Sequence, residues 1–147
     1  MTEDEIYAEA LKIADRRCRV AEGEPFGEPG EVGKLFKLRL SGRDEETFAC
    51  AFLDSRHFLI AYEELFYGSL DGAEVHPRVV AKRALAHNAA AVIVAHNHPS
   101  GNPEPSAADR AVTARLKQSL ALLDIRLLDH FVIGSGLPLS MAARGYV

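Results

Sequence analysis

Apolar residues recur at helical spacing in four stretches of the chain. This spacing predicts helices over residues 2–22, 32–40, 77–88 and 106–120. Thr2 and Glu5 fit a capping box at the start of the first helix, and Pro77 suits the first turn of the third. The second range also fits a strand, because Lys37 and Arg39 alternate with apolar neighbours, so both structures stay open there.

Five further stretches are apolar or rich in β-branched and aromatic residues. They predict strands over residues 47–53, 57–62, 65–70, 89–95 and 125–133. A turn at Asp54-Ser55-Arg56 should join the first two strands in a hairpin. The stretch 89–95 has no polar alternation, so we expect it to be buried on both faces. The order of these elements predicts the α/β class, with a single mixed-sheet domain flanked by helices.

The size and composition of the chain favour one globular domain. It has 147 residues, of which 48% are apolar. Because the segment 23–30 is rich in Pro and Gly, we expect a loop there. We therefore divide the chain into an N-terminal helix and loop (1–29) and a main domain (30–147).

Charge and cysteine content narrow the choice of partners and compartment. The formal net charge is −4, whereas sequence-independent binding of nucleic acid needs a concentrated basic face; a local basic patch stays open. Cys18 and Cys50 lack metal-type spacing and fit a reducing cytoplasm. The N-terminus is acidic and shows no signal peptide, and no apolar run is long enough to span a bilayer. We expect a cytoplasmic protein without a membrane partner.

A polar loop with two histidines follows the predicted strand 89–95. His96 and His98 are two residues apart, so on an extended backbone their side chains point the same way. The loop then reaches Ser106 and Asp109 at a helix start, where the carboxylate can return to the histidines. Two histidines and one carboxylate, with a position left for water, are typical of a catalytic zinc site. Ser106 and Asp109 also fit an ordinary helix cap, and the two interpretations are compatible.

A zinc hydrolase needs two further groups. One is a base that moves the proton of the attacking water, and the other is a donor to the oxyanion of the tetrahedral intermediate. Ser106 is near enough to Asp109 in the sequence to be that donor. The candidate bases are the carboxylates at strand boundaries, namely Glu45, Glu46, Glu63 and Glu64. These residues do not by themselves identify the base, and each one also fits a solvated acid.

The motif around the two histidines matches a known pattern. It reads His96-Asn97-His98-Pro99-Ser100-Gly101, then Pro105-Ser106, then Asp109. Over residues 30–147 the chain resembles the RadC family, a bacterial branch of the JAB/MPN (JAMM) metalloprotease superfamily. The JAMM pattern is a Glu, a long gap, H-x-H, and later a Ser and an Asp. The resemblance implies the JAB/MPN, cytidine-deaminase-like architecture.

The resemblance also implies roles for the matching residues. His96, His98 and Asp109 would bind one Zn²⁺, and Ser106 would stabilise the oxyanion. The implied reaction is hydrolysis of an amide bond, which in JAMM relatives is often an isopeptide bond. The implied partner is a peptide or protein substrate that the motif does not identify.

The resemblance favours one of the four candidate bases. The family's glutamate precedes a core strand, as Glu46 does, and lies about fifty residues before the H-x-H motif. Glu63 is the reserve choice, because it is closer to the histidines in the sequence.

Two other functions stay open. H-x-H with an Asp also suits phosphate chemistry, so the chain could be a metal-dependent phosphoesterase or nuclease linked to DNA repair. It could also be a non-catalytic MPN-type interaction module. Longer RadC proteins carry an N-terminal helix-hairpin-helix region associated with DNA contact, and the first thirty residues are too few for it. Nucleic acid is therefore a less favoured partner, and a homo-oligomer stays open.

The remaining histidines have ordinary explanations. We expect His57 and His87 at the surface and His76 in a turn before Pro77. His130 lies in an otherwise apolar stretch, so we expect a buried, hydrogen-bonded residue that could orient a metal ligand.

Overall fold

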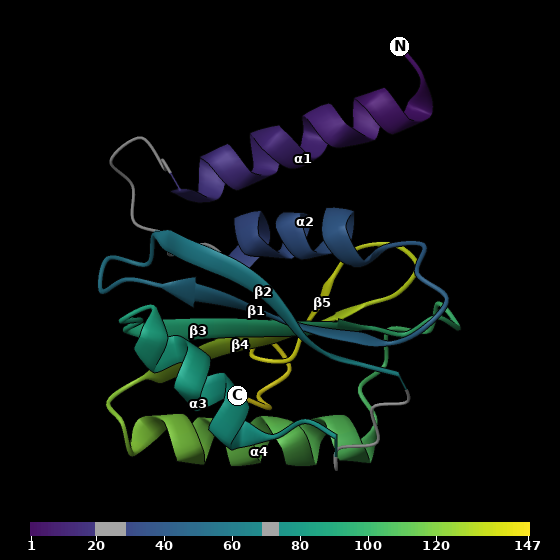
Figure 1. Ribbon diagram of the computed structural model, residues 1–147. Coiled ribbons are helices and arrows are strands. Elements are labelled where there is room, and N and C mark those ends of the chain that lie inside the picture. Colours follow the sequence, from purple (N-terminus) through teal and green to yellow (C-terminus); the bar gives the residue numbers. More distant parts are fainter. Residues whose placement is uncertain (20–28, 69–73) are drawn as a thin grey trace.

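The computed structural model describes residues 1–19, 29–68 and 74–147, and a five-stranded sheet lies at its centre (Figure 1). The strands are β1 (Thr47–Leu53), β2 (Leu59–Tyr67), β3 (Ala91–Asn97), β4 (Arg126–Ile133) and β5 (Leu139–Ser140). Their order across the sheet is β2-β1-β3-β4-β5. β3 and β4 are parallel, and the other neighbouring pairs are antiparallel. The predicted mixed sheet is therefore confirmed.

Helices cover both faces of the sheet. They are α1 (Glu3–Arg19), α2 (Pro29–Leu40), α3 (Pro77–Ala86) and α4 (Ala107–Ala121). In Figure 1, α2 lies on one face with α1 stacked outside it, whereas α3 and α4 lie on the other face. The strand alternative for residues 32–40 is wrong, because the buried side chains there follow helical spacing, namely Val32, Leu35, Phe36 and Leu40.

The two central strands, β1 and β3, supply both halves of the core. Every residue of each is buried, which confirms the expectation for residues 91–95 of the predicted stretch 89–95. On one face, small side chains such as Ala49 and Ala95 pack against α2. On the other face, larger ones such as Phe52 and Val94 pack against α3 and α4. Because strand side chains alternate between faces, core packing fixes the direction of every side chain along β3.

The prediction of two separate strands over 57–62 and 65–70 is wrong, because β2 runs unbroken from Leu59 to Tyr67. Two consecutive acids, Glu63 and Glu64, suggest a break in the sequence. In the structure Arg83 pairs with the first and Arg43 with the second. The charge of each carboxylate is therefore neutralised by an arginine, and the strand continues through both residues.

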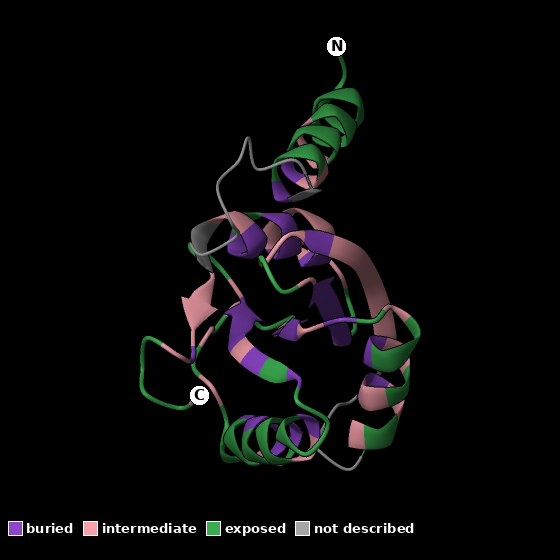
Figure 2. Cartoon of the chain, turned by 90° about the vertical axis from the view of Figure 1, so that its left-hand side faces the viewer, coloured by how far each residue is buried: buried purple, intermediate pink, exposed green. Residues whose placement is uncertain are grey.

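The N-terminal part of the chain is only partly described. The predicted loop 23–30 falls mostly on residues 20–28, which lie outside the described residues, and α2 already begins at Pro29. Figure 2 shows that α1 is largely exposed. The Tyr7 hydroxyl of α1 donates to the Leu38 carbonyl of α2. The division at residues 29 and 30 stays a prediction. Within the described ranges, no helix is long and apolar enough to cross a membrane.

Candidate metal centre

His96, His98 and Asp109 come together at the end of β3 and the start of α4. The His98 N–H donates to the Ile133 carbonyl (2.8 Å), so the chain continues along the sheet beyond Asn97. His96 and His98 therefore point the same way, as their spacing predicts. Asp109 belongs to the first turn of α4, which is capped by Ser106. Ser106 Oγ accepts from the Asp109 N–H (3.0 Å), and Asp109 Oδ2 accepts from the Ser106 N–H (2.7 Å). The helix cap thus fixes where the Asp109 carboxylate points.

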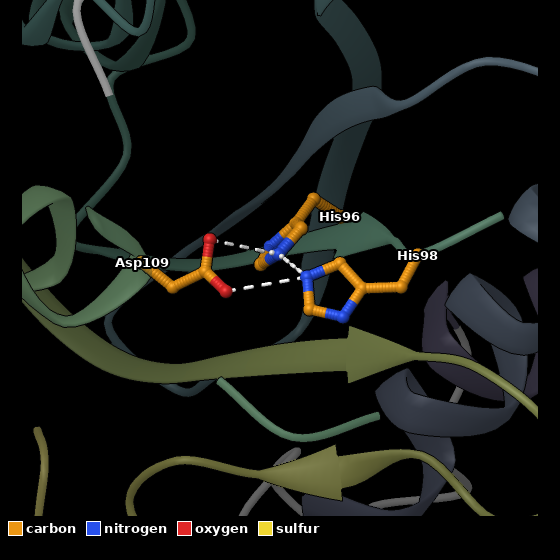
Figure 3. Close-up of side chains that lie close together, drawn as sticks. All are labelled: His96, His98 and Asp109. Atoms are coloured by element: carbon orange, nitrogen blue, oxygen red, sulfur yellow. Dashed lines mark hydrogen bonds and ion pairs between the residues drawn. The ribbon is translucent and has the colours of Figure 1, made fainter. Parts of the chain in front are cut away.

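The three side chains converge on one point (Figure 3). The two imidazole Nε2 atoms lie 2.9 Å apart. His96 Nε2 lies 3.1 Å from Asp109 Oδ1, and His98 Nε2 lies 3.2 Å from Asp109 Oδ2. Ligand atoms of a tetrahedral zinc ion with 2.0–2.1 Å bonds are about 3.3 Å apart, so a slight expansion of this triangle fits the ion. The group could therefore hold a metal ion and leave a fourth position for another ligand.

Burial and hydrogen bonding shift the pKa values of this group. Burial by itself raises the pKa of the Asp109 carboxyl, but the hydrogen bonds from His96 and His98 hold that pKa well below its ordinary value. The hydrogen bond to Asp109 raises the pKa of His98. Asp109 is therefore ionised across the physiological range, and a proton competes with a metal for the His98 imidazole, whose pKa is raised.

A chain of hydrogen bonds behind His96 determines which nitrogen carries the proton. The Thr113 hydroxyl donates to the Asp109 backbone carbonyl (2.7 Å), so its oxygen can accept from His130 Nδ1 (2.7 Å). His130 Nε2 is then an acceptor and lies 2.7 Å from His96 Nδ1. His96 carries its proton on Nδ1, and its Nε2 lone pair is directed at the metal position.

Burial keeps this chain of hydrogen bonds in one state. His130 is fully buried, and burial lowers its pKa well below the ordinary value, so the ring is neutral. This agrees with the expectation of a buried histidine that orients a ligand. The second imidazole is oriented independently, since His98 Nδ1 donates to the Asn102 carbonyl (2.8 Å). In their neutral forms both rings therefore direct Nε2 lone pairs to the side of Asp109, and the hydrogen bonds to Asp109 form when a proton takes the place of a metal on Nε2.

The segment that carries Glu46 is tied to the strand between the two histidines. Asn97 Oδ1 accepts from the Thr47 N–H (2.7 Å), and Asn97 Nδ2 donates to the Glu45 carbonyl (3.1 Å). The buried amide thus holds the backbone on both sides of Glu46. The charge of Glu46 is close enough to contribute to the raised pKa of His98. The preferred candidate base is therefore within electrostatic range of one candidate metal ligand.

The other candidate bases have different surroundings. Glu63, the reserve choice, accepts from Arg83 through both oxygens (2.8 and 3.0 Å) and lies 2.9 Å from His87 Nε2. Glu64 accepts both Nη groups of Arg43 (2.8 and 2.6 Å). The exposed Glu45 contributes its backbone carbonyl to Asn97. His87, which we expected at the surface, is half-buried, and its ring packs on a Phe ring of β1.

The sequence interpretation assigns no role to two contributors to this region, namely Thr113 and Asn97. Thr113 lies one helical turn after Asp109 on α4, and this spacing is a signal that could have identified it. Asn97 stands between the two histidines, so on a strand its side chain must point to the opposite side. That position could have marked it as a structural residue rather than a ligand.

Comparisons with known proteins agree with this geometry. A family model described as the RadC-like JAB domain matches residues 26–146. The chain belongs to the RadC-like JAB domain family. The JAB superfamily includes metalloproteases, and the resemblance drawn from the histidine motif is confirmed at the level of the family.

Several bacterial relatives are closely similar to this RadC-like chain. A UPF0758 protein of Xanthomonas campestris is 61% identical over 140 residues, covering 94% of this chain and 62% of the relative. A UPF0758 protein of Xanthomonas axonopodis is 60% identical over 143 residues, covering 96% and 64%. One of Xylella fastidiosa is 54% identical over 140 residues, covering 94% and 62%. The chain thus spans less than two thirds of the length of these relatives.

Proposed function

We propose that this RadC-like domain is a zinc-dependent amide hydrolase that acts on a peptide or protein substrate in the cytoplasm. The observation that carries the proposal is the triangle of His96, His98 and Asp109, with both Nε2 lone pairs directed inward. Nitrogen and carboxylate ligands with an open position suit zinc in a catalytic site. When bound, zinc lowers the pKa of water to near 7 and polarises a carbonyl oxygen.

Glu46 is the proposed general base. It accepts a proton from the attacking water and passes it to the nitrogen of the leaving amine. A base must keep its position through both transfers, and the Asn97 bonds to Glu45 and Thr47 hold the backbone of Glu46 for this purpose. Glu63 is less suited, because Arg83 and His87 occupy its carboxylate.

Ser106 is the proposed donor to the developing oxyanion. Its oxygen accepts from the Asp109 N–H, which leaves its hydrogen as a donor, and its residue is exposed. It also lies at the N-terminus of α4, where the helix dipole favours negative charge. A hydroxyl held by the cap can therefore meet an oxyanion without reorganisation.

The proposal is tested by a substrate panel on zinc-loaded protein. The panel comprises quenched fluorescent peptides, isopeptide-linked peptides, single-stranded DNA and duplex DNA. We expect cleavage in one of the amide classes, loss of cleavage with a chelator, and recovery when zinc is restored. Cleavage of DNA without cleavage of any amide would establish the phosphoesterase alternative instead. A partner that binds equally well after metal removal, with no cleavage, would establish the interaction module.

A further inference from the structure

A cavity of about 270 Å³ begins at His98, one of the proposed metal ligands. Its walls come from the end of α2 and the following loop, from residues 97–101 and from residues 133–135. The Ser135 N–H donates to the Gly101 carbonyl (2.8 Å), which joins two of these walls. A Cβ atom on Gly134 would lie only 2.5 Å from the Gly101 oxygen, so the two walls meet closely at this glycine. The cavity is therefore preformed rather than created by a moving loop.

The described residues that line this cavity include two cations, Lys37 and Arg43, and no acid. The charge of Arg43 is already compensated. Its two Nη groups bind both oxygens of Glu64, and its Nε donates to the Arg39 carbonyl (3.1 Å). The planar donor face of the guanidinium is therefore used within the protein.

Lys37 is the cavity cation for which the described residues provide no carboxylate partner. It is half-buried, and its ammonium group donates to the Gly134 carbonyl. In the described part of the chain, no carboxylate lies within ion-pair distance of it. An ammonium group has three donors, so two are left for a ligand. Lys34, one turn earlier on the same helix, is instead exposed and paired with Glu31 (3.5 Å).

We propose that this cavity binds a carboxylate group of the substrate through Lys37, and that His98, which lines the cavity, connects this subsite to the metal centre where the amide is cleaved. The proposal rests on the proposed function and names its substrate class: amides that carry a carboxylate near the scissile bond. One uncompensated positive charge matches the single negative charge of a carboxylate. A phosphate monoester carries up to two negative charges, and the guanidinium of Arg43 does not meet the second one because it is already paired with Glu64.

The test is direct binding, independent of catalysis. N-acetylglycine, its neutral amide and inorganic phosphate are titrated into zinc-loaded protein, and the backbone amide shifts of Ser41 and Ser135 are followed by NMR. We expect the acid to bind about tenfold more tightly than the amide, as for a hydrogen bond to a charged group. Lys37→Met should abolish this preference, whereas Lys37→Arg and the matched control Lys34→Met should keep it.

Three results would overturn the carboxylate assignment. They are equal binding of acid and amide by wild type, a preference that survives Lys37→Met in folded protein, and a Lys37-dependent preference for phosphate over the acid. The failure of the proposed function is separate. If the panel finds no amide hydrolysis while the acid still binds through Lys37, the catalytic proposal fails and the anion subsite stands.

Discussion

Two clusters on the same face of the sheet bring histidine to a carboxylate, yet they have different chemistry. His96 lies opposite Phe48 on β1, and Glu63 lies opposite Cys50, so both side chains face α3 and α4. In the first cluster His96 and His98 meet Asp109. In the second cluster Glu63 meets His87 and Arg83.

The two clusters differ in whether a permanently charged cation pairs with the carboxylate. In the Glu63 cluster, the guanidinium of Arg83 neutralises the carboxylate and donates to both of its oxygens. In the Asp109 cluster, the described side chains that pair with the carboxylate are two imidazoles, and the hydrogen bonds of their Nδ1 atoms determine where their protons lie. A histidine near a carboxylate therefore does not define a metal site; convergent lone pairs without a permanent counter-charge do.

The largest expected effect is the removal of a ligand. His96→Ala should weaken zinc binding by roughly a thousandfold or more, because it removes one of three protein ligands. The matched control is His87→Ala, which removes the histidine of the other cluster and should leave the affinity within about twofold. The measurement is zinc affinity by competition with a chromophoric chelator. Equal losses in both variants would contradict the distinction between the clusters.

A second prediction separates the two glutamates. Glu46→Gln should lower amide hydrolysis by about 10²–10⁴-fold while zinc stays bound, because the amide cannot accept the proton. Glu63→Gln should leave turnover nearly unchanged. The two rates are measured with the substrate identified by the panel, together with zinc content. Normal turnover in Glu46→Gln would remove Glu46 from the role of base.

A third prediction concerns the hydrogen bonds behind His96. Thr113→Val removes the acceptor for His130 Nδ1–H, so His130 loses the bond that holds its proton away from His96. We expect zinc affinity to fall about 10–100-fold, as for other residues that orient a ligand. Thr113→Ser keeps the hydroxyl and is the control that should bind zinc normally. Wild-type affinity in Thr113→Val would show that the proton positions are set in another way.

The smallest expected effect is on stability and its pH dependence. Hydrogen bonding to Arg83 and His87 lowers the pKa of Glu63 in the folded protein. Ionised Glu63 therefore stabilises the fold above its unfolded pKa, near 4.5, and this contribution is lost as the pH falls through the folded pKa. We expect Glu63→Gln to cost up to about 1 kcal/mol at pH 7 and progressively less below pH 4. Urea unfolding at pH 7 and below pH 4 measures the stability of wild type and Glu63→Gln. A difference in unfolding free energy that stays the same at the two pH values would contradict the prediction.

The sequence predicts the metal triangle better than its surroundings. The spacing of His96 and His98 on a strand determines their common direction, and the cap at Ser106 places Asp109, so a local pattern is sufficient. The position of Glu46 beside the site, by contrast, depends on long-range pairing through the Asn97 amide. No local spacing encodes such a contact across fifty residues of chain.

The errors in the fold prediction have the same origin. Two consecutive acids, Glu63 and Glu64, suggest a break in β2 when only the local sequence is considered. Their partners Arg83 and Arg43 lie about twenty residues away in opposite directions along the chain, so a local pattern does not include them. His87 likewise looks like an ordinary surface residue in the sequence, because the residue that it contacts, Glu63, is distant along the chain. Burial and charge compensation are properties of the folded chain, so local polarity alone misjudges residues that find a distant partner.

The most direct test of the account is the metal content of the protein as it is made. Elemental analysis is applied to wild type, His98→Ala and His87→Ala, each purified without added metal and without a metal-affinity tag. The account predicts about one zinc per chain in wild type and His87→Ala, and its loss in His98→Ala. Wild-type protein that contains no metal and takes up none on titration would contradict the account, and the histidine motif would then be structural.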